Sequence, residues 1–237
     1  MSRASGGSLR IAAYAAALIV FVSATANAQV FIGSPDTPRK GSWEAGGGVV
    51  WTGGYDLDSL DALLTGNEGN SGGPFSLFAT EARLRPVVGA QARIGFYVSP
   101  TLAFEAGVQY SRPVFEASLS DDAEDAEDLT AEETLSRYVI DGSVVYHMRQ
   151  LAFSRGRGVP FISAGAGYLR ELHEGEELVE TGTTYHAGAG VKFWMTAGKR
   201  RFGLRGDAGV TVRDGGFDFE DKRRLLPTAG ASLIVLF

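Results

Sequence analysis

The chain has 237 residues and no cysteine, so neither a disulfide nor a thiolate metal site can form. It carries 22 Lys and Arg residues against 28 Asp and Glu residues, and this acidic balance argues against nucleic acid as a partner. Its 32 glycines and its mean hydropathy near zero favour many short alternating strands over long apolar helices.

The N-terminal residues predict export. Arg3 and Arg10 precede an apolar run from Ile11 to Val22, and Ala26-Asn27-Ala28 matches the small-x-small pattern that signal peptidase cleaves. The run holds about 12 strongly apolar residues, whereas a spanning helix needs about 20. We therefore predict a signal peptide over residues 1–28, a leader over 29–40 and one domain over 41–237.

From residue 42 the sequence alternates with period two, which is typical of strands with one apolar face. In the first strand the apolar face carries Trp43, Ala45, Gly47, Val49 and Trp51. Trp43 and Trp51 lie eight residues apart, which corresponds to about 20 Å along a barrel axis at a rise of about 3.3 Å and a tilt of about 40°. That distance fits two aromatic girdles at the edges of a lipid-facing band.

Seven more strands follow the same pattern. Their apolar rows run from Leu84 to Phe96, Leu102 to Tyr110, Tyr138 to Tyr146, Ile162 to Tyr168, Tyr185 to Met195, Phe202 to Val212 and Leu225 to Phe237. The connections alternate in length. The long, polar ones cover about Gly53 to Glu81, Ser118 to Thr134, Leu172 to Gly182 and Asp214 to Arg224; the short ones are Ser99-Pro100, about Met148 to Gly158, and Ala197 to Arg200. This asymmetry is typical of barrels with long loops outside the cell and short periplasmic turns.

The eight-strand register, together with a last strand that ends on the aromatic Phe237, resembles the small eight-stranded bacterial outer-membrane β-barrel proteins. The resemblance implies an all-β, antiparallel, up-and-down transmembrane barrel in the cell outer membrane. It further implies a periplasmic leader, a monomer surrounded by lipid and lipopolysaccharide, and recognition of the strand ending at Phe237 by the barrel assembly machinery. We expect Phe237 to pair with the first strand. A soluble barrel of lipocalin type is the alternative, but the less apolar face is dominated by glycine with scattered charges and suits a crowded interior.

The inward face collects charges of both signs. They are Glu44, Glu105, Asp141 and Asp207 with Arg85, Arg93, Lys192 and Arg205. Because buried charges persist when they are paired, we predict an ion-pair network that fills the lumen. A narrow ion path is the alternative, since inward glycines leave space; they are Gly46, Gly48, Gly89, Gly107, Gly188 and Gly190.

Other candidate sites are weak. The acidic run Asp121 to Asp128 could bind a divalent cation, but it lacks the glycine and spacing of an EF-hand, so we predict a solvated loop. Of the three histidines, His147, His173 and His186, none forms a His-x-Ser pair, and only His173-Glu174 with a loop serine remains conceivable as catalytic. We predict no catalytic, cofactor or metal site.

The functional expectation is therefore a non-enzymatic envelope protein with a structural or surface-interaction role. A narrow small-solute channel comes second, and a lipid-modifying barrel enzyme comes third because no nucleophile and base stand together.

Overall fold

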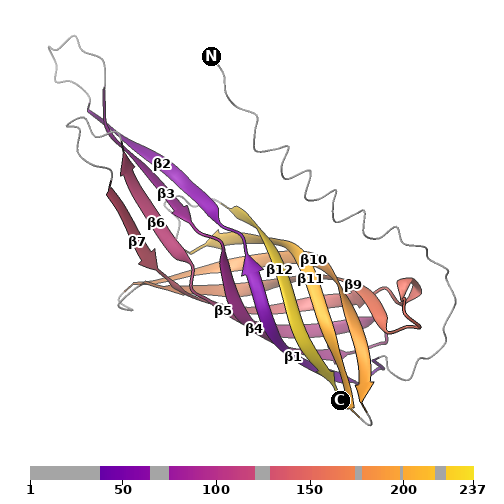
Figure 1. The fold of residues 1–237 in the computed structure, drawn as a ribbon. Coiled ribbons are helices and arrows are strands. Elements are labelled where there is room, and N and C mark those ends of the chain that lie inside the picture. The colour runs from indigo at the N-terminus through magenta and orange to yellow at the C-terminus, as the bar shows by residue number, and fades with distance from the viewer. Residues whose placement is uncertain (1–37, 65–74, 121–128, 174–177, 198–199, 217–222) are drawn as a thin grey trace, which may run out of the picture. The chain divides into compact units, whose positions relative to one another are not determined.

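The computed structural model describes residues 38–64, 75–120, 129–173, 178–197, 200–216 and 223–237. Eight antiparallel strands close into a barrel, in the order β1, β12, β11, β10, β9, β8, β5, β4 (Figure 1). Their bounds are β1 Trp43–Thr52, β4 Val87–Tyr97, β5 Leu102–Ser111, β8 Ser136–His147, β9 Gly158–Leu172, β10 Val179–Ala197, β11 Arg200–Gly215 and β12 Arg224–Leu236. The predicted eight-stranded antiparallel barrel is confirmed.

The barrel closes where the first and last strands meet. β1 pairs with β12 from Glu44 opposite Leu236 to Thr52 opposite Thr228. Beyond the ladder, Trp43 and Phe237 exchange main-chain hydrogen bonds of 2.8 and 2.9 Å. The expected pairing of Phe237 with the first strand is therefore correct, and it leaves neither strand as a free edge along this stretch.

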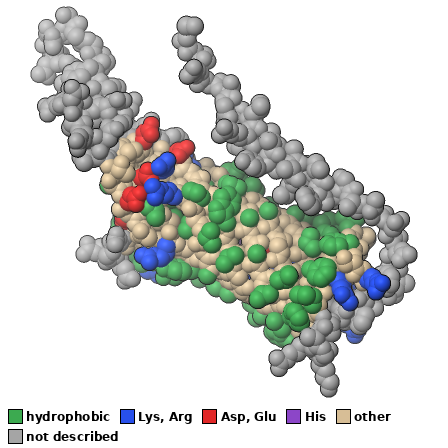
Figure 2. Space-filling model, viewed as in Figure 1, with side chains coloured by type: hydrophobic (Ala, Val, Ile, Leu, Met, Phe, Trp, Pro, Cys, Tyr) green, Lys and Arg blue, Asp and Glu red, His purple; other side chains and the backbone are tan. Residues whose placement is uncertain are grey.

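The outer surface of the barrel is apolar. Trp43 and Trp51 are both exposed, as are Tyr138 and Tyr146 of β8, and between them lie exposed branched residues such as Ile140. Figure 2 shows hydrophobic side chains spread over the visible barrel wall, with charged side chains toward the two ends. A closed barrel with an apolar outer band satisfies its backbone internally and suits a lipid environment, as a transmembrane barrel does.

Four further strands form a second sheet, the outer sheet, in the order β2-β3-β6-β7. They are β2 Tyr55–Leu64, β3 Phe75–Leu84, β6 Val114–Ser120 and β7 Leu129–Thr134. The described parts of the predicted loops from Gly53 to Glu81 and from Ser118 to Thr134 are therefore largely strand, and that prediction was wrong. The β2–β3 ladder contains register shifts near Leu57 and Ala62, and such irregularities break the period-two pattern from which strands are predicted.

Two of the four links between the barrel and the outer sheet contain a proline. Pro86 separates β3 from β4, and Pro113 separates β5 from β6; proline cannot donate to a ladder, so the strands are interrupted there. The predicted row from Leu84 to Phe96 thus belongs to two strands, β3 and β4. Leu84, predicted to face outward, is buried, while Arg85, predicted to face the lumen, lies half exposed on the outer sheet.

The two barrel ends differ. We call the end with the links at 98–101 and 148–157 the turn end, and the end from which the hairpins continue into the outer sheet the hairpin end. The link after β8 contains a 3-10 turn, η1 Arg149–Leu151. Among the described residues, no helix is both long enough and apolar enough to cross a membrane.

Candidate functional site

The lumen near the turn end is braced by Lys192 of β10. Its ammonium group is fully buried and donates to Glu44 Oε1 at 2.8 Å, Glu105 Oε1 at 2.8 Å and the Tyr97 hydroxyl oxygen at 3.2 Å. The Tyr97 hydroxyl in turn donates to Glu44 Oε2 at 2.6 Å. In the barrel order β10 and β4, which carries Tyr97, lie four strands apart in either direction, so this contact crosses the lumen.

Arg205 of β11 extends the network. It donates to Glu105 Oε2 at 2.6 Å and to Asp207 Oδ1 at 2.9 Å, and its guanidinium lies 4.6 Å from the centre of the Phe161 ring. We call Glu44, Tyr97, Glu105, Lys192, Arg205 and Asp207 the charge network. The predicted ion pairing of the lumen is confirmed for all five of its charged members.

An apolar floor lies on the turn-end side of the charge network. Tyr97, Phe161 and Trp194 have almost no exposed surface and belong to one cluster of buried residues. The other members are Ala103, Val145, Val159, Ile234 and Leu236. His147 is buried and points into this region, with Nε2 3.3 Å from the Tyr97 hydroxyl. Ion pairs and apolar packing together occupy the lumen at this level.

A second pair of bonds lies at the hairpin end. The carboxylate of Glu171 accepts from Arg137 Nε at 2.7 Å and from Arg213 Nη2, and all three side chains are buried. Arg213 also donates to the Tyr55 hydroxyl of β2 at 2.8 Å, which ties the barrel to the outer sheet. None of these three residues, Arg137, Glu171 and Arg213, was among the charges predicted to fill the lumen. Extending the alternation by one residue before Tyr138 would have found Arg137.

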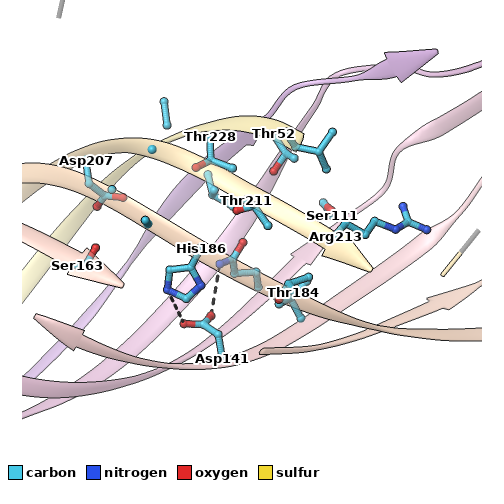
Figure 3. A pocket seen from close by; sticks show the side chains of 18 of the residues that line it. Thr52, Ser111, Asp141, Ser163, Thr184, His186, Asp207, Thr211, Arg213 and Thr228 are labelled. Atoms are coloured by element: carbon cyan, nitrogen blue, oxygen red, sulfur yellow. Dashed lines mark hydrogen bonds and ion pairs between the residues drawn. The ribbon is translucent and has the colours of Figure 1, made fainter. Parts of the chain in front are cut away.

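Between these two levels lies a cavity of about 90 Å³ (Figure 3). Hydroxyl side chains line it, with Thr184, Thr211 and Thr228 among them, and Figure 3 shows them on strands around the space. Asp141, predicted for the ion-pair network, instead accepts from Gln109 at 3.4 Å and lies 4.0 Å from His186 Nε2. Arg93, also predicted there, donates to Gln91 Oε1 at 2.8 Å. A volume of this size holds several waters.

The inward glycines leave less space in the lumen than their lack of a side chain suggests. At Gly48 a β-carbon would lie 2.0 Å from the Ala231 carbonyl oxygen, and at Gly190 it would lie 2.3 Å from that of Gly206. The neighbouring strand occupies this space, so these two glycines permit close strand approach and do not open a path through the lumen.

The histidines do not come together. His186 faces the cavity, His147 lies in the floor, and His173 bonds Glu133 of β7 at 2.8 Å near the hairpin end. Within the described part of the chain, no group of three or more His, Asp or Glu side chains is arranged to hold a metal ion. The acidic run Asp121 to Asp128 and Glu174 lie outside the described residues.

The outer sheet carries its own ion pairs. Glu116 of β6 lies 2.5 Å from both Arg83 and Arg85, and Arg85 also lies 3.0 Å from Glu132 of β7. The hydrogen bond from Arg83, with the charges of both arginines, holds the pKa of the Glu116 carboxyl below its usual value. Three strands of the outer sheet are thereby joined through charged side chains.

Comparison with known proteins supports the fold. No protein-family model matches the chain, and no curated protein sequence matches it significantly. Among solved structures, the outer membrane protein OprG from Pseudomonas aeruginosa has a TM-score of 0.50 at 9% identity over 85% of this chain and 98% of its own. Neisserial surface protein A (NspA) gives 0.46 at 11% identity over 83% and 98% of the two chains, and the N-terminal β-barrel domain of Pseudomonas aeruginosa OprF gives 0.37 at 13% identity over 84% and 100%. The likeness to OprG agrees with the strand order, and the chain has the fold of the small eight-stranded outer-membrane β-barrel proteins.

Proposed function

We propose that this protein is a non-enzymatic outer-membrane barrel with a closed lumen, and that its outer sheet presents a surface for structural or interaction work in the envelope. The observation that carries the proposal is the position of Lys192. Its ammonium group is bonded to β1, β4 and β5 at once, so it bridges the barrel interior from wall to wall.

A permeating ion would have to displace these bonds. Removing one partner from a buried ion pair costs about 3–5 kcal/mol, because the remaining charge is left without compensation. The apolar floor of Phe161 and Trp194 adds a dry barrier on the turn-end side of the network. Both features oppose continuous water through the lumen.

Planar-bilayer recording of the refolded protein tests the closed lumen. We expect no steady conductance from the unmodified protein, and steady ohmic steps would refute the proposal. The variant carrying Lys192→Ala and Phe161→Ala should conduct, since it removes the brace and a large part of the floor. Val235→Ala on the lipid-facing wall is the matched control and should stay silent.

A small-solute channel is the second candidate, and the hydroxyl-lined cavity above the charge network favours it. On this alternative the charge network is a gate and the cavity is the entrance. Conductance that appears in the unmodified protein under applied voltage would support the channel against the closed barrel.

The surface role depends on the hairpin end. The β6–β7 hairpin brackets the acidic run at 121–128, and its ladder from Val114 opposite Thr134 to Leu119 opposite Leu129 lies outside that run. Shortening 121–128 to Asn-Gly should therefore leave the ladder intact while removing the acidic charge of the run. If the run helps to organise lipopolysaccharide through divalent cations, cells with this deletion should become detergent-sensitive at low magnesium. A second variant, in which Ser and Gly replace every residue of 121–128, keeps the length of the run and removes only its charge. Unchanged detergent sensitivity in both variants would contradict this role.

We also propose that the C-terminal strand is recognised during assembly. Phe237 is exposed on the outer wall, at the edge of the lipid-facing row of β12. Phe237→Ala should lower the amount of barrel in the outer membrane of cells but not the yield of refolding in detergent. Equal loss in both would assign the effect to stability alone.

A further inference from the structure

The link between β8 and β9 at the turn end is a compact, bonded structure. Phe153 donates to the Gly158 carbonyl at 2.9 Å, Gly158 returns a bond of 3.1 Å, and the Trp194 amide of β10 donates to the Arg157 carbonyl at 2.9 Å. Ala152 packs against the buried floor. The link is therefore held both by its own backbone and by the neighbouring strand.

Two large apolar side chains of this link face away from the core. Leu151 is 50% exposed and Phe153 is 47% exposed, although Ala152 between them packs inward. The Phe153 ring covers Gly158, where a β-carbon would lie 2.4 Å from it, and Gly158 pairs with Phe193 of the outward row of β10. Phe153 thus extends the lipid-facing row beyond the end of the strand.

The backbone between Phe153 and Gly158 is held in an uncommon conformation. Ser154 and Arg155 have φ values of 51° and 61°, in the left-handed region that non-glycine residues rarely adopt, and Gly156 follows at 83°. Such conformations persist only where the surroundings enforce them, and they concentrate at functional positions. Here they hold the Arg155 side chain exposed at the tip of the link, next to the exposed Arg157.

Basic residues surround this link. Arg39 and Lys40 are exposed, and Pro38 before them lines the same small cavity as Arg149. Within the described residues of the turn end, no Asp or Glu side chain is exposed, since Glu44 is buried in the charge network. Figure 2 shows Lys and Arg side chains without acidic neighbours at this end of the visible face. The chain as a whole has a net charge of −6, so the positive charge of this rim is opposite in sign to that of the whole chain.

We infer that the turn end binds the headgroup of an anionic phospholipid from the periplasmic leaflet, through Arg155 and Arg157, with Leu151 and Phe153 against its acyl chains. Arginine donates two parallel hydrogen bonds to a phosphate, and cationic side chains near an anionic lipid surface each favour binding. Leu151 and Phe153 continue the lipid-facing band. The lipid headgroup would therefore contact the arginines of this link, and the acyl chains would contact its two apolar side chains. The short connections and both described chain ends lie at this end, which is the pattern of the periplasmic side.

Native mass spectrometry of the refolded protein in detergent tests this inference. The probes are phosphatidylglycerol and phosphatidylcholine with identical acyl chains, added in competition. We compare the unmodified protein with the double variant Arg155→Asn and Arg157→Gln, in which Asn tolerates the left-handed backbone. The matched control is Arg112→Gln with Arg170→Gln, two exposed arginines toward the hairpin end. Heat-modifiable migration confirms that each variant forms the barrel.

We expect the unmodified protein to retain phosphatidylglycerol preferentially, and the preference to fall by about 25-fold in the Arg155 and Arg157 variant, about fivefold for each arginine. The control variant should keep the preference, and Arg155→Lys with Arg157→Lys should keep most of it. Equal retention of the two lipids by the unmodified protein would overturn the inference. Loss of the preference in the Arg112 and Arg170 variant alone would place the anionic lipid at the other rim, and the inference would be wrong.

Discussion

Replacing Lys192 with Met removes the central cation of the lumen at little change in volume. Glu44 then keeps only its bond from Tyr97, while Glu105 keeps Arg205 at 2.6 Å. Removing one partner of a buried ion pair costs about 3–5 kcal/mol, and Lys192 serves two carboxylates, so we expect a loss of about 5 kcal/mol in the free energy of unfolding. Adding Glu44→Gln removes the uncompensated charge and should restore about 2 kcal/mol.

Urea unfolding in phospholipid vesicles, followed by tryptophan fluorescence at neutral pH, measures these differences. The control is Leu204→Met, which lies on the lipid-facing side where Leu204 pairs with Phe193, and it should change stability by less than about 1.5 kcal/mol. An unchanged unfolding midpoint for Lys192→Met would refute the reasoning. So would a double variant that is less stable than Lys192→Met alone, because the carboxylate of Glu44 would then not be the uncompensated charge.

Three further outcomes are expected. Arg205→Leu should destabilise the barrel by several kcal/mol in the same urea assay, because Glu105 and Asp207 both lose a bond. The outer sheet should loosen in acid while the barrel does not. The lowered pKa of Glu116 means that the stability from its ion pairs is present above the ordinary carboxyl pKa and is lost as pH falls through the shifted pKa. Amide protection factors in β3 and β6, which correct for the slower intrinsic exchange in acid, should therefore be lower at pH 3 than at pH 6, and Glu116→Gln should abolish this difference. Replacing the β2–β3 and β6–β7 hairpins by short turns should leave a folded barrel, because β1 pairs with β4 and β5 with β8 independently of the outer sheet; failure to show heat-modifiable migration would contradict this.

The barrel was predictable because lipid imposes a strict rule on every strand. Each residue faces either lipid or lumen, so the outward row from Trp43 to Trp51 recurs at every second residue and defines the register. The same rule places Glu44, Lys192 and Arg205 inward, where charge can persist only in pairs. Parity and charge balance predicted that inward charges pair, although Arg85, Arg93 and Asp141 lie outside the network.

The outer sheet was not predictable by the same rule. Outside the lipid both faces of a strand can be polar, and β2 mixes Asp56 with Leu57 and shifts its pairing register. Pro86 and Pro113 mark the change from barrel to outer sheet, and they could have served as the signal for it. The partner of each inward charge could not be predicted from the sequence either. Asp141 lies next to His186 and not next to an arginine. The stagger between strands decides which inward residues meet, and the alternation of a single strand does not reveal that stagger.

Closure between β1 and β12 has a kinetic consequence. Glu44 and Leu236 are neighbours in the ladder yet lie about 190 residues apart in the chain, and contacts of such long sequence separation make folding slow. Until β12 pairs with β1, one edge of β1 presents a row of unpaired amides and carbonyls. Every folding intermediate in which the barrel is still open has such an edge. An open edge of this kind is a template for pairing with another chain, so the nascent protein is exposed to aggregation for as long as its two ends remain apart.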